Sequence, residues 1–287
     1  MRVRGCRSFI TICAVSALVL CVPAFLQAAM VIGHRGMGKA NKTIPENSLT
    51  ALVFALAVGA DAVEFDVQLT KDGEAVLAHD QKLERLSSGR GCIARTSYAA
   101  IEKLRMKDGS GTIHPAERIS TLAMALEAVK PFVRDDAPFV ADIHIKVYDG
   151  LRGDWGGISG CPKTKYRRLV RKTIEEVRRA GLTGKVLLSA FDERALDYAR
   201  KLEPAVKLGV LSFFSKRYIV DRAAAKKYDA VVLNWENAGK SIFKYARSAG
   251  LLAFMWFSRT DTDRADRFAL SRTDGVITDR VQKLAGR

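Results

Sequence analysis

The sequence predicts a single-domain α/β barrel, in which parallel strands alternate with helices. Short apolar runs, many of them β-branched, recur along the chain, and amphipathic stretches separate most of them. Such alternation over a whole chain implies a parallel sheet with right-handed crossovers. About eight strands within residues 30–287 favour closure of this sheet into one barrel over an open sheet or two smaller domains.

The pattern gives each expected element in order. The expected strands are residues 30–33, 61–67, 75–78, 139–145, 185–189, 206–211, 230–233, 251–256 and 275–278. The expected helices are residues 48–58, 121–129, 165–180, 193–202, 216–227, 239–249 and 263–270. Gly59, Gly181 and Gly250 stand between a helix and the next strand, where glycine tolerates the left-handed cap that ends helices. Residues 81–118 are polar with one short helix candidate at 98–104, so we expect an insertion over one barrel end.

The first 29 residues are predicted to be a signal peptide. Three arginines precede an almost uncharged apolar run at residues 8–26, and small residues follow it. A membrane helix is the alternative, because the run is nearly long enough to span a bilayer. Pro23 and the small residues favour cleavage, so we expect export, to the periplasm or out of the cell.

The formal net charge of +16 at pH 7 invites anionic partners: nucleic acid, an acidic membrane surface or a phosphate-bearing substrate. The basic residues are scattered, and the densest group, at residues 163–172, is typical of the solvated face of a helix. Nothing resembles a zinc finger or an aromatic-rich RNA-binding strand. We therefore expect a small phosphodiester or phospholipid as partner, no nucleic acid and no obligate protein partner. An anionic membrane surface stays open as a contact.

Cys92 and Cys161 are the cysteines that remain beyond the signal peptide. Both lie in glycine-rich loop segments, and two leftover cysteines in an exported protein often pair. A disulfide and two free thiols both stay open. No cysteine spacing of the metal-binding type is present.

A carboxylate pair falls where barrel enzymes place their active sites, at the C-terminal ends of the strands. Glu64 and Asp66 close the second expected strand and, being two apart, point to the same face. Adjacent bare carboxylates repel and raise each other's pKa, a penalty that a hard divalent cation such as Mg²⁺ or Ca²⁺ removes. The alternative is that Arg35 or Lys146 pairs with one carboxylate and no metal binds.

Two histidines flank this pair. His34 follows the first expected strand, and His79 closes the third. An unperturbed imidazole titrates near pH 6.5, so the two are the natural acid and base near neutrality. His114 has no acidic neighbour in sequence and is predicted to be a loop histidine.

These residues belong to longer motifs that resemble those of glycerophosphodiester phosphodiesterases. The motifs are His34-Arg35-Gly36, Pro45-Glu46-Asn47-Ser48, residues 59–67, Thr70-Lys71-Asp72-Gly73 and His79-Asp80, with weaker matches at residues 119–122, 189–192, 256 and 274–279. The resemblance spans nearly all of the chain beyond the signal peptide. Its long, ordered N-terminal motif is far more specific than a three-residue pattern.

The resemblance implies a TIM barrel of the phosphatidylinositol-phospholipase C-like type, with a role for each residue. The implied roles are metal ligands for Glu64 and Asp66, the acid/base pair for His34 and His79, phosphate contacts for Arg35 and Lys146, and orientation of neighbouring groups for Glu46. For Trp256 a wall against the glycerol or the leaving group and plain core packing both stay open. In the implied reaction a glycerol hydroxyl of the substrate attacks phosphorus and releases the alcohol. Water then opens the cyclic phosphate.

One strand departs from the family pattern. The family's fourth barrel strand reads Glu-x-Lys, and its Glu is a third metal ligand. Here residues 142–146 read Asp-Ile-His-Ile-Lys, so Lys146 is kept, His144 occupies the ligand position, and Asp142 lies two residues earlier on the same face. Imidazole suits Zn²⁺ or Mn²⁺ better than Ca²⁺. One divalent metal ion is therefore expected, Mg²⁺ or Ca²⁺ with Mn²⁺ or Zn²⁺ as alternatives, with His144 or Asp142 as third ligand.

These observations predict metal-dependent hydrolysis of glycerophosphodiesters to glycerol 3-phosphate and an alcohol. The first alternative is a phospholipase D-like enzyme that acts on phospholipids or lysophospholipids. The second, from a different class, is a non-catalytic phosphate- or lipid-binding barrel in which the change at residue 144 has abolished metal binding.

Overall fold

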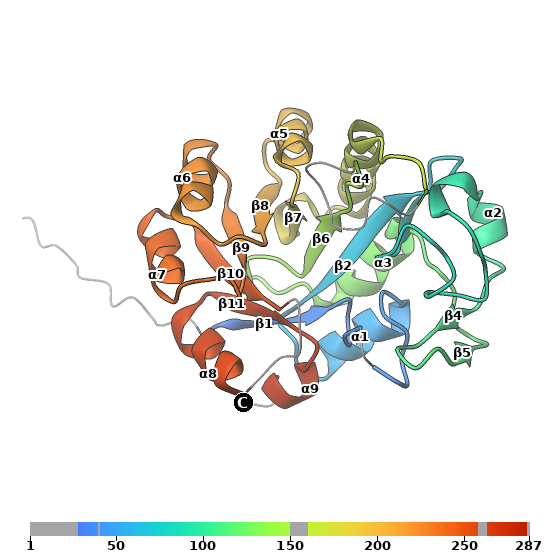
Figure 1. Ribbon diagram of the computed structural model, residues 1–287, viewed down its shortest axis with the longest axis horizontal. Helices are drawn as coiled ribbons and strands as arrows, with labels where there is room; N and C mark the ends of the chain where they lie inside the picture. The colour runs from blue at the N-terminus through green and yellow to red at the C-terminus, as the bar shows by residue number, and fades with distance from the viewer. Residues whose placement is uncertain (1–27, 40, 150–159, 258–262, 286–287) are drawn as a thin grey trace, which may run out of the picture.

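The computed structural model describes residues 28–39, 41–149, 160–257 and 263–285, and over these ranges the chain forms a closed α/β barrel (Figure 1). Eight parallel strands pair in a ring, each with the next, and β11 pairs with β1 to close it. The strands are β1 (Met30–His34), β2 (Ala62–Leu69), β6 (Ala141–Ile145), β7 (Val186–Ala190), β8 (Lys207–Ser212), β9 (Ala230–Asn234), β10 (Leu252–Trp256) and β11 (Gly275–Thr278). The predicted fold class is confirmed.

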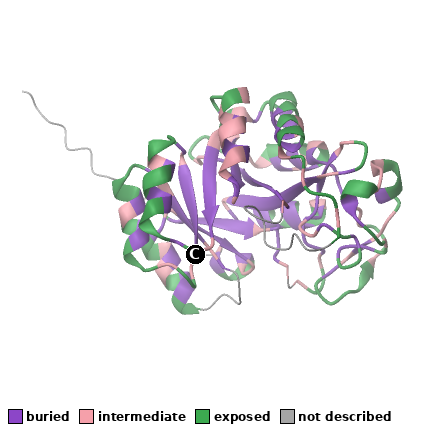
Figure 2. Cartoon of the chain, turned by 45° about the horizontal axis from the view of Figure 1, so that its top comes forward, coloured by how far each residue is buried: buried purple, intermediate pink, exposed green. Residues whose placement is uncertain are grey.

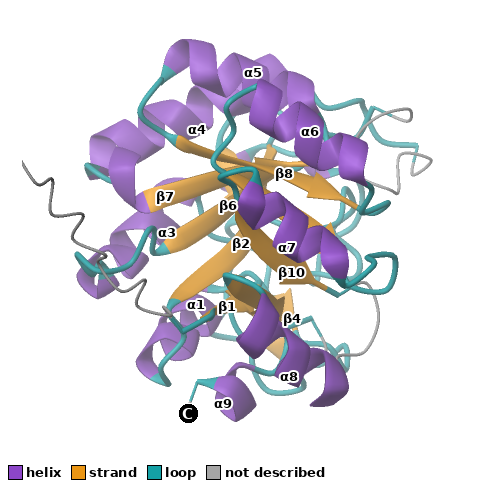
Figure 3. Cartoon of the chain, turned by 90° about the vertical axis from the view of Figure 1, so that its left-hand side faces the viewer, coloured by secondary structure: helices purple, strands orange, loops and turns teal. Residues whose placement is uncertain are grey.

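Helices surround the strands (Figure 3). They are α1 (Leu49–Ala57), α3 (Leu122–Val129), α4 (Tyr166–Ala180), α5 (Glu193–Leu202), α6 (Arg217–Ala225), α7 (Ser241–Ser248), α8 (Asp263–Arg272) and α9 (Val281–Leu284). Ser48 and Thr121 cap α1 and α3 by accepting hydrogen bonds from backbone N–H groups of the first turn, at 3.0 and 3.2 Å. Gly181 ends α4 in the left-handed conformation, at φ 73°.

Two apolar layers hold the barrel together. The outward side chains of the strands pack against the buried faces of the helices. Inside the barrel, residues such as Ile32, Leu187 and Phe254 form a second buried cluster, in which the Phe139 and Phe254 rings lie 5.5 Å apart. Figure 2 shows the strands buried, with the exposed residues on the surrounding helices and loops. Because side chains fill the barrel interior, chemistry is confined to its C-terminal mouth.

The prediction that residues 75–78 form the third barrel strand is wrong. β3 (Ala75–Leu77) pairs antiparallel with the end of β2, as a hairpin. Residues 70–74 connect the two, whereas parallel strands need a crossover of about a dozen residues or more. The third barrel strand is therefore β6, which the sequence analysis counted as the fourth, and His79 follows the hairpin.

The segment 81–118, predicted to be an insertion over one barrel end, lies to one side of the barrel in the view of Figure 1. It contains the short elements η1 (Ile93–Arg95), α2 (Tyr98–Ile101), β4 (Met106–Lys107) and β5 (Ile113–His114), and further single turns, η2 (Lys130–Phe132) and η3 (Thr183–Lys185), lie outside it. The insertion has its own buried apolar cluster, which includes Leu83, Ile93 and Met106.

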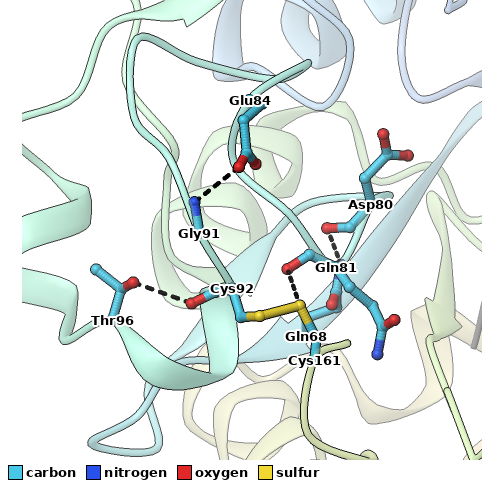
Figure 4. Close-up of a disulfide and its surroundings, with 8 residues drawn as sticks. All are labelled: Gln68, Asp80, Gln81, Glu84, Gly91, Cys92, Thr96 and Cys161. Atoms are coloured by element: carbon cyan, nitrogen blue, oxygen red, sulfur yellow. Dashed lines mark hydrogen bonds between the residues drawn. A yellow bond between two sulfur atoms is a disulfide. The ribbon is translucent and has the colours of Figure 1, made fainter. Parts of the chain in front are cut away.

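Of the two states left open for the cysteines, the structure has the disulfide. Cys92 in the insertion is bonded to Cys161 in the segment before α4 (Figure 4). The bond joins two loops that are 69 residues apart in the chain.

Nearly all of the predicted signal peptide, residues 1–27 of 1–29, lies outside the described residues. Within the described ranges no helix is long and apolar enough to cross a bilayer.

Candidate active site

A cavity of about 330 Å³ opens at the C-terminal mouth of the barrel. Its polar lining residues are His34, Arg35, Lys39, Glu64, Asp66, His79, Asp142, His144, Lys146 and Ser189. Its apolar lining residues are Phe191, Leu211, Phe213, Trp256, Phe257 and Ile277. Of the site residues expected from the sequence, all line this cavity except Glu46.

Three buried side chains in this cavity have metal-ligating atoms close together. In the sheet register His144 lies beside Asp66, and Asp142 lies beside Glu64. The Nδ1 atom of His144 is 3.0 Å from Oδ1 of Asp66 and 3.9 Å from Oε1 of Glu64. One ligand atom from each of Glu64, Asp66 and His144 lies within 4.8 Å of the others.

The chemistry of these three donors fits a divalent cation. Ligand atoms about 2.0–2.4 Å from one ion are at most about 4.8 Å from each other, which matches the separations found. Two carboxylates with one imidazole suit Mn²⁺ or Zn²⁺ as well as harder ions. Without an ion, the Nδ1–H of His144 donates to Asp66, so a cation at this position would compete with that proton.

Asp142 is not a member of the three-residue group, although it lines the same cavity. Its side chain is 0% exposed, and the Ser189 hydroxyl is the polar group that lowers its pKa in part. Burial, with the charge of Glu64 second, raises the pKa of Asp142 to about 7. Below neutral pH, Asp142 is therefore protonated and needs no positively charged partner.

Arg35 connects the carboxylates of the mouth. Its Nη1 donates to Oε1 of Glu46 at 2.9 Å, its backbone N–H donates to Glu64 at 3.0 Å, and its Nε lies 3.4 Å from Asp66. The backbone of Arg35 is left-handed (φ 51°), as is that of Gly36 (φ 82°). A Cβ at Gly36 would lie 2.5 Å from the backbone of α1, which explains the glycine of the His-Arg-Gly motif.

Glu46 lies behind the cavity wall. Both its oxygens accept from a second arginine, Arg85, at 2.8 and 2.9 Å, in addition to Arg35. Burial alone would raise the pKa of Glu46, but the two arginines lower it below the usual value. Glu46 therefore holds Arg35 in place. Arg85 lies in the insertion and belongs to no recognisable motif, so no sequence signal marked it.

Asn47 supports Asp66 from α1's side of the barrel. Its side chain donates to Oδ2 of Asp66 and accepts from the backbone N–H of Asp66, both at 3.1 Å. Asn47 is part of the Pro-Glu-Asn motif, so a sequence signal existed, but the motif alone did not give its partner.

His34 is fixed by a carboxylate from the far end of the chain. Its Nδ1 lies 2.5 Å from Oδ1 of Asp279, which follows β11. Burial alone would lower the pKa of His34, but the charge and the hydrogen bond of Asp279, together with the charge of Glu64, raise it above its usual value. Asp279 lies in the segment 274–279, which resembles the family motif, but nothing in the sequence indicated that it pairs with His34.

The pKa of His79 shifts in the opposite direction to that of His34. The Nδ1 of His79 lies 2.7 Å from Oδ1 of the neighbouring Asp80. Burial lowers the pKa of His79 to about 4, and the positive charges of Lys146 and Arg35 act in the same direction. The structure therefore favours protonation of His34 over protonation of His79, whose imidazole is neutral at pH 7.

His114 does not join this site. It lies in β5 of the insertion, where its Nε2 is 2.9 Å from Asp108, and it is not among the lining residues of the cavity.

The apolar half of the cavity is built mainly of aromatic rings. The ring of Trp256 lies 5.9 Å from that of Phe191 and 6.2 Å from that of Phe213. The ring centroids of Phe213 and Phe214 lie 5.4 Å apart, and Phe214 is 53% exposed. Trp256 thus both lines the cavity and packs against the apolar cluster inside the barrel.

Known proteins resemble this chain over most of its length. A glycerophosphodiester phosphodiesterase of Caldanaerobacter subterraneus subsp. tengcongensis is 28% identical over 257 residues, covering 89% of this chain and 96% of that protein. A second, from Bacillus altitudinis, is 31% identical over 184 residues, covering 63% of this chain and 66% of that protein.

Solved structures share the fold. A phosphodiesterase of Oleispira antarctica, in complex with the product sn-glycerol-3-phosphate, superposes with a TM-score of 0.73 at 23% identity and covers 90% of this chain and 96% of its own. Residues 34–283 match the model of the glycerophosphoryl diester phosphodiesterase family. The chain therefore belongs to the glycerophosphoryl diester phosphodiesterase family, a family of phosphoric diester hydrolases.

Proposed function

We propose that this enzyme hydrolyses glycerophosphodiesters to sn-glycerol 3-phosphate and an alcohol, with a divalent metal ion and with His34 and His79 as acid and base. One observation carries the proposal: two imidazoles of opposite protonation preference line one cavity with the Glu64, Asp66 and His144 group. The names of the relatives and the product bound to the Oleispira antarctica phosphodiesterase support the substrate class.

Glu64, Asp66 and His144 would hold the metal ion. When bound there, a divalent cation polarises phosphoryl oxygens and stabilises the negative charge that builds on them. Arg35 and Lys146 line the same cavity and supply fixed positive charge for the phosphate. Asp142, with its raised pKa, is proposed to stay outside the ligand set.

The two histidines divide the proton transfers. His79, neutral at pH 7, accepts the proton of the substrate hydroxyl that attacks phosphorus. His34, whose pKa is raised beside Asp279, donates its proton to the oxygen of the leaving alcohol. In the second step the roles reverse: His34 takes a proton from the water that opens the cyclic phosphate, and His79 returns its proton to the glycerol oxygen. Both histidines then regain their initial states.

The test is release of glycerol 3-phosphate from glycerophosphocholine and glycerophosphoethanolamine, with Mg²⁺, Ca²⁺, Mn²⁺ or Zn²⁺ added singly. His34→Ala and His79→Ala should each lower kcat by at least about 10²-fold. His114→Ala is the matched control, because it removes a carboxylate-paired histidine outside the cavity. No product with any of the four metals would refute the substrate assignment, and unchanged kcat in a variant would refute that histidine's role.

A second candidate is phospholipase D-like cleavage of phospholipids or lysophospholipids. The aromatic series that runs from Trp256 through Phe213 to the exposed Phe214 supports it, because such a surface suits an acyl chain. Mass spectrometry of the products from lipid vesicles, with and without anionic lipid, separates the two activities and also tests contact with an anionic membrane.

A non-catalytic barrel is the remaining alternative, and calorimetry addresses it. Binding of metal at micromolar concentration supports the hydrolase, whereas absence of binding supports a barrel that has lost its metal.

We also propose that the protein is exported to the periplasm or out of the cell. The basic and apolar leader supports this, and so does the disulfide, because such bonds persist in oxidising compartments. Cell fractionation and N-terminal sequencing of the natural protein test it; a cytoplasmic protein with an intact leader would refute it.

A further inference from the structure

Hydrogen bonds from other segments hold the backbone carbonyls around His79. In the His79 segment, residues 78–81, four successive carbonyl oxygens each accept a hydrogen bond. The side-chain amide of Gln68 donates to the carbonyls of Ala78 and Asp80, both at 2.8 Å. The hydroxyl of Tyr148 donates to the carbonyl of His79 itself, and the backbone N–H of Ile93 donates to that of Gln81 at 2.9 Å.

Gln68 and Tyr148 are suited to this task because water has little access to compete for their hydrogen bonds. Both are buried, with 6% and 4% of their surfaces exposed. Gln68 lies in β2, two residues beyond Asp66, and Tyr148 follows β6. The amide nitrogen of Gln68 carries two hydrogens, and the two carbonyls use both of them. Neither residue lines the active-site cavity.

The disulfide completes a closed loop around the same segment. Cys92 forms a β-bridge with Lys82, directly after the His79 segment. Its partner Cys161 lies three residues before Thr164, which exchanges two hydrogen bonds with Tyr148, at 2.9 and 3.0 Å. The bond thus joins the chain beside His79 to the chain that holds Tyr148. Figure 4 shows Gln68, Asp80 and Gln81 around the disulfide.

We propose that Tyr148 and Gln68 are positioning residues for His79, and that the Cys92–Cys161 disulfide braces them. The proposal rests on the proposed role of His79. A side chain that must meet a reacting proton within hydrogen-bond distance loses rate steeply when its backbone shifts. Fixing the carbonyls of residues 78–81 fixes the peptide planes that orient the imidazole, and it leaves the cavity free for substrate.

Tyr148→Phe is the direct test, because it removes one hydroxyl and keeps the ring that packs 5.5 Å from Lys146. We expect kcat for glycerophosphocholine to fall about 3- to 10-fold, the equivalent of one hydrogen bond, with KM within about 2-fold of wild type. Tyr228→Phe is the matched control: Tyr228 is 5% exposed and donates to Asp197 at 2.6 Å, outside the cavity. It should leave kcat unchanged.

A double variant separates positioning from general destabilisation. In a His79→Ala background Tyr148→Phe should cause no further loss of kcat, because the side chain that it positions is absent. The same additional loss in both backgrounds would overturn the proposal, as would a Tyr148→Phe enzyme with wild-type kcat.

Hydrogen exchange provides a readout that does not depend on activity. The amides of Ala78, Leu83 and Ile93 are hydrogen-bonded at 2.9–3.0 Å, so peptides covering residues 78–93 report on the segment. Exchange there should be faster in Tyr148→Phe and in the double variant Cys92→Ser/Cys161→Ser, and unchanged in Tyr228→Phe. Unchanged exchange in both test variants would refute the bracing. If His79→Ala keeps full activity, the proposed role of His79 fails, while the exchange result still decides whether the segment is clamped.

Discussion

Asp142→Asn gives a sharp prediction, because it removes a buried carboxyl whose protonation depends on folding. In the unfolded chain an aspartate has a pKa of about 3.9, whereas burial and the charge of Glu64 raise the folded-state pKa of Asp142 to about 7. The folded protein therefore binds this proton more tightly, so its stability falls as pH rises from about 4 to about 7. The penalty is about 1.5 kcal/mol at pH 5 and about 4 kcal/mol at pH 8.

The assay is urea unfolding of wild type and Asp142→Asn in EDTA at several pH values, since a metal ion would alter the charges nearby. Asparagine cannot ionise, so any fixed cost of burying its amide is the same at every pH. Between pH 5 and pH 8 the wild type should lose about 3 kcal/mol relative to the variant. Asp135→Asn, at an exposed site, is the control, and its pH profile should parallel that of wild type. Parallel profiles for Asp142→Asn as well would refute the reasoning.

Three further predictions concern the same cavity. Mn²⁺ at about 100 times its Kd should raise the free energy of unfolding by about 2.7 kcal/mol relative to the protein in EDTA. In thermal melts, His144→Ala should lose most of this stabilisation. An equal stabilisation of the variant would exclude His144 as a ligand. Asp279→Asn should lower kcat about 10-fold or more. It should also move the alkaline limb of the pH–rate profile to lower pH, because Asp279 raises the pKa of His34. An alkaline limb at the wild-type pH would contradict this. Glu46→Gln should cost about 3 kcal/mol in urea unfolding at pH 7, because it weakens a buried ion pair. Since its arginine partners lower the pKa of Glu46, the difference should shrink as pH falls below about 4, and a pH-independent difference would argue against the ionised pair.

Local patterns were sufficient for most of the fold. Apolar runs and amphipathic stretches have periods that a strand or helix imposes on its own residues, so the strands and helices of the barrel could be found without knowledge of their neighbours. One exception is α9 (Val281–Leu284), which no expected helix covers. The other is the run at residues 75–78, which reads as a strand whether its partner is parallel or antiparallel. The decisive clue was the short connection at residues 70–74, which excludes a crossover.

Some residues of the candidate site could likewise be found from local sequence patterns, and others could not. His34, Glu64 and His79 could be found because they stand at or near expected strand ends and within motifs that resemble those of a known family. Asp279 could not be assigned, because it meets His34 across 245 residues, through the pairing of β11 with β1 that closes the barrel. Tyr148 reaches the backbone of His79 across 69 residues, again through the tertiary fold.

The sequence by itself determined the barrel, the family and the side chains available at its mouth, because these depend on residue types and local spacing. Only the tertiary structure decided that Cys92 and Cys161 pair, that His144 joins the carboxylate group without Asp142, and that the pKa values of His34 and His79 shift in opposite directions. These properties depend on burial and on distances between charges, and both are set by how distant segments pack. That packing gave His34 a carboxylate partner and placed His79 among buried positive charges.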